Sequence, residues 1–177
     1  MNRDQLCLEI FNSAHITGEF KLRSGVVSNE YFDKYQFESI PQLLNNIAIH
    51  ITEIVSKLDY DILAPLEMGG IPISTALALK VDKIQCFVRK KAKEYGTAKL
   101  AEGPNIDGKK LLIVEDVVTS GGQIILSTND LRKQGAIITD AVCVIDREAG
   151  GKEKLTEIGV TLHPLFTMTE LKAISQL

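Results

Sequence analysis

The segment LLIVEDVVTSGGQ, residues 111–123, decides how the rest of this chain is interpreted. It begins with a wholly apolar run, continues through the adjacent carboxylates Glu115 and Asp116, and ends in a Thr-Ser-Gly-Gly turn. An unpaired charge in a protein core costs several kcal/mol or forces a pKa shift. Two acids directly after a buried run therefore indicate a strand over 111–114 whose carboxyl end leads to a ligand.

Three further apolar runs resemble this one, at residues 61–64 (DILA), 84–88 (IQCFV) and 141–145 (AVCVI). Helical patterns separate the runs, including IPISTALALK and GQIILSTNDLRKQG, and Gly135 is placed to end the second helix. Short, nearly continuous apolar strands that alternate with helices are typical of a parallel sheet covered on both faces. The sequence therefore predicts an α/β fold with a central parallel sheet.

Residues 41–58 predict an amphipathic helix that begins near Pro41. Its apolar stripe consists of Leu44, Ile47, Ala48, Ile51, Ile54, Val55 and Leu58. The chain contains no internal repeat, low-complexity tract or linker-like segment. We therefore expect residues 1–177 to form a single domain.

Composition excludes several classes of protein. The chain has 177 residues, which is enough to bury a core without disulfides or metals. Its net charge of -3 argues against an electrostatic nucleic-acid binder. The N-terminus is too charged for a signal peptide and no apolar run approaches a membrane span, so no membrane is expected. Cys7, Cys86 and Cys143 form no CxxC pair, which favours buried, reduced thiols in a cytoplasmic protein.

Charge or glycine follows each of the four apolar runs. The four following segments read PLEMGG, RKKAKEYG, EDVVTSGG and DREAGG. In open α/β sheets the ligand binds at the carboxyl ends of the strands, where the strand order switches. We therefore expect these four loops to meet in one site.

The TSGGQ turn, residues 119–123, is suited to bind a phosphate group. Glycines allow a tight turn with inward N–H groups, and the following helix adds partial positive charge at its N-terminus. Acids beside such a cradle would repel a phosphate alone. Glu115 and Asp116 instead suit the hydroxyl groups of a sugar attached to that phosphate.

Residues 89–99 (RKKAKEYGTAK) carry five basic side chains around Gly96. An isolated run of this kind is an ordinary solvated loop, but its place beside the phosphate turn favours a mobile lid over an anionic substrate. Arg147 is either one half of a surface ion pair or an anion contact, and the neighbouring loops favour the contact. Residues 103–110 match the Walker A spacing only superficially, because they precede a strand, and we interpret them as a turn.

The VEDVVTSGG segment resembles the phosphoribosyl pyrophosphate (PRPP) motif of the type I phosphoribosyltransferases. Residues 18–33, 87–103 and 145–151 are similar to the orotate phosphoribosyltransferase family, in the same order and at similar spacing. The resemblance spans about residues 10–170. It implies a type I phosphoribosyltransferase-like parallel sheet flanked by helices, with residues 1–40 forming a small hood over the base. Lys34 and Tyr35 stand where the family often has an apolar residue followed by a basic one.

The resemblance assigns roles by position. The catalytic residues would be Arg89, Lys90, Lys93 and Asp116. Those binding PRPP would be Glu67, Met68, Gly69, Gly70, Arg89, Lys90, Lys93, Tyr95, Glu115, Asp116, Val117, Val118, Thr119, Ser120, Gly121 and Gly122. Those binding orotate would be Arg23, Tyr31, Phe32, Thr119 and Arg147. No protein metal ligand is implied.

The implied reaction joins orotate to the phosphoribosyl group of PRPP and releases pyrophosphate. Mg²⁺ would be the cofactor, held mainly by the substrate's pyrophosphate and ribose hydroxyls. The implied assembly is a homodimer whose basic loop is shared between subunits. Three alternatives stay open at this stage: a phosphoribosyltransferase for another base, a non-catalytic regulator that binds PRPP, and a generic phosphate-binding domain.

Overall fold

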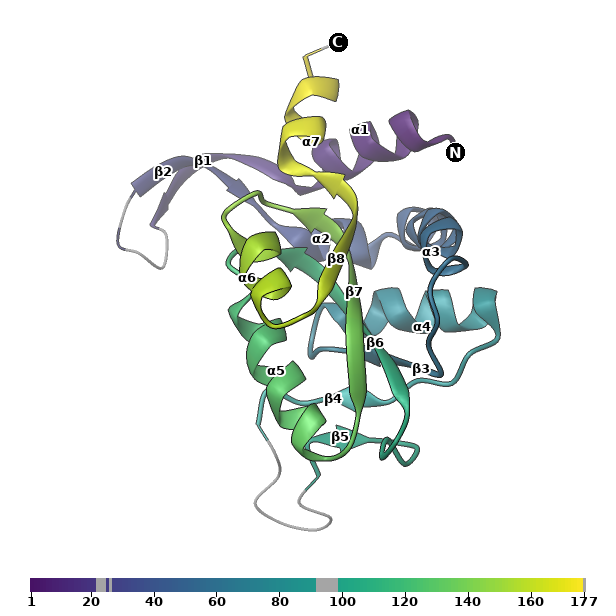
Figure 1. The fold of residues 1–177 in the computed structure, drawn as a ribbon. Coiled ribbons are helices and arrows are strands. Elements are labelled where there is room, and N and C mark those ends of the chain that lie inside the picture. Colours follow the sequence, from purple (N-terminus) through teal and green to yellow (C-terminus); the bar gives the residue numbers. More distant parts are fainter. Residues whose placement is uncertain (22–24, 26, 92–98, 177) are drawn as a thin grey trace.

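A four-stranded parallel sheet forms the centre of the molecule (Figure 1). The computed structural model describes residues 1–21, 25, 27–91 and 99–176. The strands lie in the order β3 (Ile62–Pro65), β6 (Lys110–Val118), β7 (Ile137–Asp146) and β8 (Thr161–Thr167). The predicted α/β class with a central parallel sheet is confirmed.

Helices cover both faces of this sheet (Figure 1). α3 (Pro41–Val55) and α4 (Gly70–Val81) pack on one face, and α5 (Gly122–Lys133) and α6 (Gly151–Glu157) pack on the other. The buried residues form two clusters: a first core that includes residues of α3 and α4, and a second core that includes residues of α5 and α6. Along β6, Leu112 and Val114 belong to the first core, whereas Leu111 and Ile113 belong to the second. This alternation explains why the strand is apolar throughout, because both of its sides are buried.

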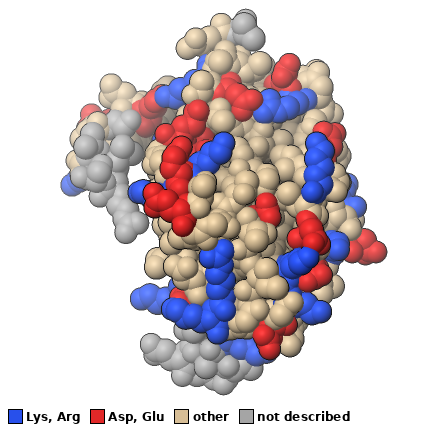
Figure 2. All heavy atoms as spheres, viewed as in Figure 1, with Lys and Arg blue, Asp and Glu red and all other residues tan. Residues whose placement is uncertain are grey.

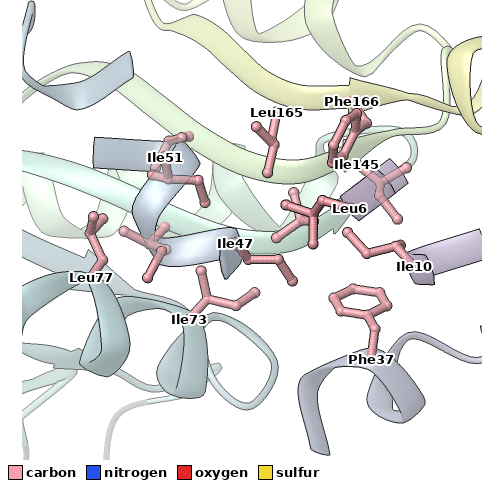
Figure 3. Packing of buried hydrophobic residues seen from close by; sticks show 14 of the residues in the cluster. Leu6, Ile10, Phe37, Ile47, Ile51, Ile73, Leu77, Ile145, Leu165 and Phe166 are labelled. Atoms are coloured by element: carbon pink, nitrogen blue, oxygen red, sulfur yellow. The ribbon is translucent and has the colours of Figure 1, made fainter. Parts of the chain in front are cut away.

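The N-terminal segment contributes to the first core. It consists of α1 (Arg3–Ala14), the antiparallel hairpin of β1 (His15–Lys21) and β2 (Val27–Phe32), and α2 (Lys34–Ser39). Leu6, Ile10 and Phe37 from its helices meet Ile47 and Ile73 of α3 and α4 in one apolar cluster (Figure 3). The C-terminal α7 (Met168–Ile174) packs against α1. The hairpin itself extends away from the body (Figure 1).

The structure corrects three strand predictions. β6 continues beyond residue 114 to Val118, so the two acids lie within the strand and not after it. Of residues 84–88 only Phe87–Val88 form a strand, β4, which pairs with β5 (Ala101–Glu102) and joins β3 through isolated bridges. β8 was not predicted because Pro164 interrupts its pattern. β8 is an edge strand, which is where a residue without an N–H is tolerated in a sheet.

The predicted helix over residues 41–58 and the predicted buried, free cysteines are confirmed with small shifts. The 41–58 helix ends at Val55, and Leu43 is more deeply buried than Leu44. All three cysteines are free and buried. Within the described part of the chain, no helix has the length and apolar character needed to cross a bilayer. Acidic and basic side chains are interspersed over the face shown in Figure 2.

Candidate active site at the carboxyl edge of the sheet

The strand order switches between β3 and β6, and the candidate site lies at that switch. β4 bridges to one side of β3, whereas β6, the next strand of the main sheet, pairs on the other. The turns after β3 and β6 therefore open at the same edge, beside the end of β7. This is the crevice in which open α/β sheets bind ligands.

The phosphate turn is formed as the sequence predicts. Thr119 and Ser120 are exposed, and Gly121 has φ 71° at the N-cap of α5, a left-handed conformation that favours glycine. A pocket at this helix N-terminus brings one of the acids together with the turn. It is lined by Glu115, Val117, Val118, Thr119, Ser120, Gly121, Gly122, Gln123 and Ile124.

The two acids face different surroundings. Glu115 lines the phosphate pocket, whereas Asp116 is fully buried and faces α2 and the turn after β3. Oδ2 of Asp116 lies 2.5 Å from Nζ of Lys34, which is about one third exposed. Gly69 packs so closely that a Cβ there would lie 1.5 Å from the same oxygen. Sequence reasoning assigned both acids to the ribose hydroxyls and named Asp116 alone as catalytic, whereas in the structure the two side chains face different surroundings.

The pKa values of three side chains in this region depart from their ordinary values. Burial raises the pKa of the Glu38 carboxyl to about 8, and the charge of Asp116 adds to the effect. Burial also raises the pKa of the Glu115 carboxyl, and the charge of Asp116 is the second largest cause. Asp116 and Glu115 in turn raise the pKa of Lys34 against the opposing effect of its burial. The site thus gathers three carboxyl groups around one ammonium group.

The turn after β3 is tied to the start of the basic loop. Oε1 of Glu67 accepts the backbone N–H of Lys90 at 2.6 Å, and the backbone N–H of Glu67 donates to Val88 O at 2.9 Å. Nε of Arg89 pairs with Oε1 of Glu102 at 3.3 Å. Glu67, Arg89 and Glu102 line one small pocket, which brings two of the predicted PRPP-binding segments together.

A third pocket collects residues predicted to bind the base. Tyr31, Phe32 and Arg147 all line it. The backbone N–H of Arg147 donates to Val118 O at 2.8 Å, which joins this pocket to the phosphate turn. Thr119 lines the phosphate pocket and not this one. The remaining lining residues are Phe11, His15, Glu30, Met168 and Lys172.

Three predicted site residues, Arg23, Lys93 and Tyr95, lie outside the described residues. Met68 and Gly70 lie on the turn after β3, where Met68 is 61% exposed and Gly70 begins α4. Within the described residues, no group of three or more His, Cys, Asp or Glu side chains is arranged to hold a metal ion. The remaining predicted residues lie around the three pockets and the buried Asp116.

Sequence reasoning missed Lys34 and Glu38, together with the α1 and α7 residues of the base pocket. No motif marks those pocket residues, because they meet only when α1, α7 and the hairpin pack together. Lys34 and Glu38 carry a weak signal: they are four positions apart, so a helix places them on one face. The structure directs that face toward Asp116.

Comparison with known proteins identifies the family. The phosphoribosyl transferase domain family matches residues 36–165. The chain is 43% identical over 168 residues to an orotate phosphoribosyltransferase of Nocardioides sp., covering 95% of this chain and 93% of the relative. It is 41% identical over 172 residues to that of Pyrococcus horikoshii, covering 96% of this chain and 92% of the relative.

The fold agrees with solved structures as well. The orotate phosphoribosyltransferase of Mycobacterium tuberculosis H37Rv, solved with Fe(III) dicitrate, superposes with a TM-score of 0.87 at 24% identity. The match covers 96% of this chain and 98% of that one. Together with the sheet-edge site and the extent of the sequence matches, these findings show that the chain belongs to the orotate phosphoribosyltransferases of the phosphoribosyl transferase domain family.

Proposed function

We propose that this protein transfers the 5-phosphoribosyl group of PRPP to orotate, giving orotidine 5'-monophosphate and pyrophosphate, a step of pyrimidine biosynthesis. The observation that carries the proposal is a backbone hydrogen bond between residues that line the two main pockets. Arg147 lines the pocket with Tyr31 and Phe32, and its backbone bonds to Val118 of the phosphate turn. A base in the first pocket and a ribose phosphate in the second would be neighbours.

Each part of the site has a role in this reaction. The N–H groups of residues 119–122, at the N-terminus of α5, bind the 5-phosphate. The resemblance assigns Glu115 and Asp116 to the ribose hydroxyls, and Glu115 itself lines the phosphate pocket. Arg147 binds the orotate carboxylate, for which a guanidinium is suited because it can make two parallel hydrogen bonds. Tyr31 and Phe32 cover the pyrimidine ring.

Departure of pyrophosphate leaves positive character on the ribose ring. Catalysis therefore requires that the leaving charge be stabilised, the base be held in line and water be excluded. We assign the leaving charge to Arg89 and Lys90, and to Lys93 from the sequence pattern. Glu67 supports this assignment indirectly, because its carboxylate holds the Lys90 backbone against the turn after β3.

Mg²⁺ is the proposed cofactor, and the carboxylates of the site fit a metal that arrives with its substrate. Asp116 is already paired with Lys34, and Glu115 accepts the backbone N–H of Asp116 at 3.1 Å. The pyrophosphate and ribose oxygens of PRPP would therefore supply most of its ligands. When bound, the ion neutralises charge on the departing pyrophosphate.

The proposal extends to assembly and location. We propose a homodimer in which the basic loop of one subunit serves the site of the other, and a cytoplasmic location. The buried free cysteines support a reducing compartment. Sedimentation of the purified chain, with and without PRPP, tests the dimer.

A nucleotide-formation assay tests the reaction. The protein is mixed with PRPP and Mg²⁺, and orotate, uracil, adenine, hypoxanthine and guanine are offered separately. Turnover with orotate alone is the expected result. Turnover with a different base alone would move the activity to that base. Binding of PRPP without turnover would indicate a regulator in place of an enzyme.

A further inference from the structure

Glu102 lies beside Arg89 at the base of the basic loop, residues 89–99. The short strands β4 and β5 flank this loop in the sequence and pair with each other in antiparallel orientation (Figure 1). The pairing continues past the end of β4, because the backbone N–H of Arg89 donates to Leu100 O at 2.9 Å. The backbone of Arg89 is therefore held by the paired strands.

The strand register places Glu102 next to the side chain of Arg89. Glu102 lies opposite Phe87, two positions before Arg89. Alternate residues of a strand point to the same face, and diagonal neighbours across an antiparallel pair are within reach of long side chains. Nε of Arg89 accordingly donates to Oε1 of Glu102 at 3.3 Å. Phe87, Arg89 and Glu102 also line one pocket, together with Glu67.

The hydrogen bond engages only one part of the guanidinium group of Arg89. A guanidinium carries donors at Nε and at both Nη atoms. Within the described residues, Nη1 and Nη2 of Arg89 make no hydrogen bond, so their donors stay available to an anion. The side chains of Arg89 and Glu102 are 36% and 29% exposed. The pair therefore lies at the wall of the pocket, where a substrate can reach the Nη atoms.

An acid beside an arginine that binds an anion requires an explanation, because its negative charge opposes that binding. The second acid of this pocket, Glu67, already has a partner, since its Oε1 accepts the backbone N–H of Lys90 at 2.6 Å. A long arginine side chain loses rotamer freedom when it binds a ligand, and a partner that fixes its direction beforehand reduces that loss. Holding Arg89 in place explains the position of Glu102.

We propose that Glu102 is a positioning residue for the release of pyrophosphate: it holds Arg89 through Nε and directs Nη1 and Nη2 toward the departing group. This inference rests on the proposed function, in which Arg89 stabilises the leaving charge. Sequence reasoning assigned no role to Glu102. The strand after the basic loop thus sets the direction of the arginine that begins it.

Six variants of the full chain test the proposal: Glu102→Ala, Glu102→Asp, Glu102→Gln, Arg89→Ala, the double variant of Glu102→Ala with Arg89→Ala, and the control Asp130→Ala. Asp130 forms an exposed ion pair with Lys133 on α5, so its loss should change little. Glu102→Ala should lower kcat/KM for PRPP about 5- to 20-fold, the lower range for a hydrogen bond to a charged group, because the pair is partly exposed. Glu102→Asp should show a similar loss, because its shorter side chain does not reach Nε. Glu102→Gln should stay within about threefold of the parent, because its amide oxygen still accepts the bond.

The double variant measures the coupling directly. If Glu102 acts through Arg89, its loss has no further effect once residue 89 is alanine, so the double variant should match Arg89→Ala within about twofold. The effect should also be confined to the pyrophosphate side of the site. In the reverse reaction, Glu102→Ala should raise KM for pyrophosphate and leave KM for orotidine 5'-monophosphate near that of the parent, whereas general structural damage would change both constants.

Two results would overturn the inference. One is an additive cycle, in which Glu102→Ala lowers kcat/KM for PRPP equally with and without Arg89. The other is a higher kcat/KM in Glu102→Ala, which would make Glu102 a competitor of pyrophosphate for the same arginine. If Glu102→Ala does not fold by circular dichroism, Glu102→Asp takes its place in the cycle.

Calorimetric titration of the same variants with pyrophosphate and Mg²⁺ separates this inference from the proposed function, since it needs no base. If the parent binds pyrophosphate but does not convert orotate, the proposed function is wrong, and the binding cycle still decides the role of Glu102. If the parent converts orotate and the cycle is additive, the function stands and the role of Glu102 is wrong. A parent that binds neither PRPP nor pyrophosphate would overturn both.

Discussion

Replacing Gly69 by alanine tests the close packing at the centre of the site. Gly69 has φ -68° and ψ -29°, which any residue adopts, so the substitution introduces no backbone strain. Space is the constraint: the new Cβ would lie 1.5 Å from Oδ2 of Asp116 and 2.4 Å from Cγ. An ordinary contact begins at 3.4 Å, so the carboxylate or the turn must move by about 2 Å.

That movement predicts a specific loss. Asp116 is fully buried and cannot turn into solvent, so a displacement of this size separates it from Lys34 and from the ribose position. Each hydrogen bond to a charged group contributes about 1.5–3 kcal/mol. We therefore expect Gly69→Ala to lower kcat/KM for PRPP about 10- to 150-fold. Steady-state kinetics with varied PRPP measures the loss.

A matched control is Gly18→Ala on β1. Its Cβ would meet only ring atoms of Phe20, at 3.2 Å, and that exposed strand can adjust. We expect its kcat/KM to stay within about threefold of the parent, as for a surface change. Parent-like kinetics and melting temperature for Gly69→Ala would refute the reasoning, because Asp116 would then be free to move or would not bind the ribose.

Three further predictions concern stability and base recognition. Glu38→Gln should be more stable relative to the parent as pH rises from about 4.5 to about 8, because in this range the unfolded parent releases the Glu38 proton whereas the folded parent keeps it. Linkage at about 1.36 kcal/mol per pH unit limits the change in the stability difference between variant and parent to about 5 kcal/mol. We expect about 2–3 kcal/mol, because Asp116 is coupled to the change. A stability difference in urea unfolding that stays constant across this pH range would contradict the prediction. Arg147→Lys should raise KM for orotate about 10- to 100-fold with little change in KM for PRPP, since an ammonium cannot make the two parallel bonds, and equal changes in both constants would argue against carboxylate recognition. Phe166→Ala should cost about 3–5 kcal/mol of unfolding free energy in denaturant, because this ring is fully buried, whereas Leu126→Ala at a 63% exposed position of α5 should cost less than about 0.5 kcal/mol.

Local patterns predicted much of the fold. The apolar runs at 111–114 and 141–145 identify buried strands because both sides of such strands face helices. The Thr-Ser-Gly-Gly turn predicts its own geometry, since Gly121 takes a left-handed conformation that favours glycine. The segment that resembles the PRPP motif combines these two features, which is why sequence alone predicted the position and geometry of this turn.

The boundaries of β6 and the existence of β8 required the sheet itself. Pairing with β7 extends β6 through both acids, because Glu115 lies opposite Cys143 and Val117 opposite Ile145. β8 contains Pro164, which local propensity disfavours in a strand, and only its edge position makes the proline acceptable. Strand pairing is a long-range property that a local sequence pattern does not contain.

The sequence by itself determined the chemical groups of this protein: a glycine-rich turn, two acids, a basic loop and an arginine, all following apolar runs. Tertiary structure alone decided how the acids differ. Glu115 borders the phosphate pocket, whereas Asp116 is buried against Lys34, Glu38 and Gly69. The physical reason is that burial and charge compensation depend on segments far apart in the chain. Phe37 of α2 is buried in the same core as Val114 of β6, which brings α2 beside Asp116.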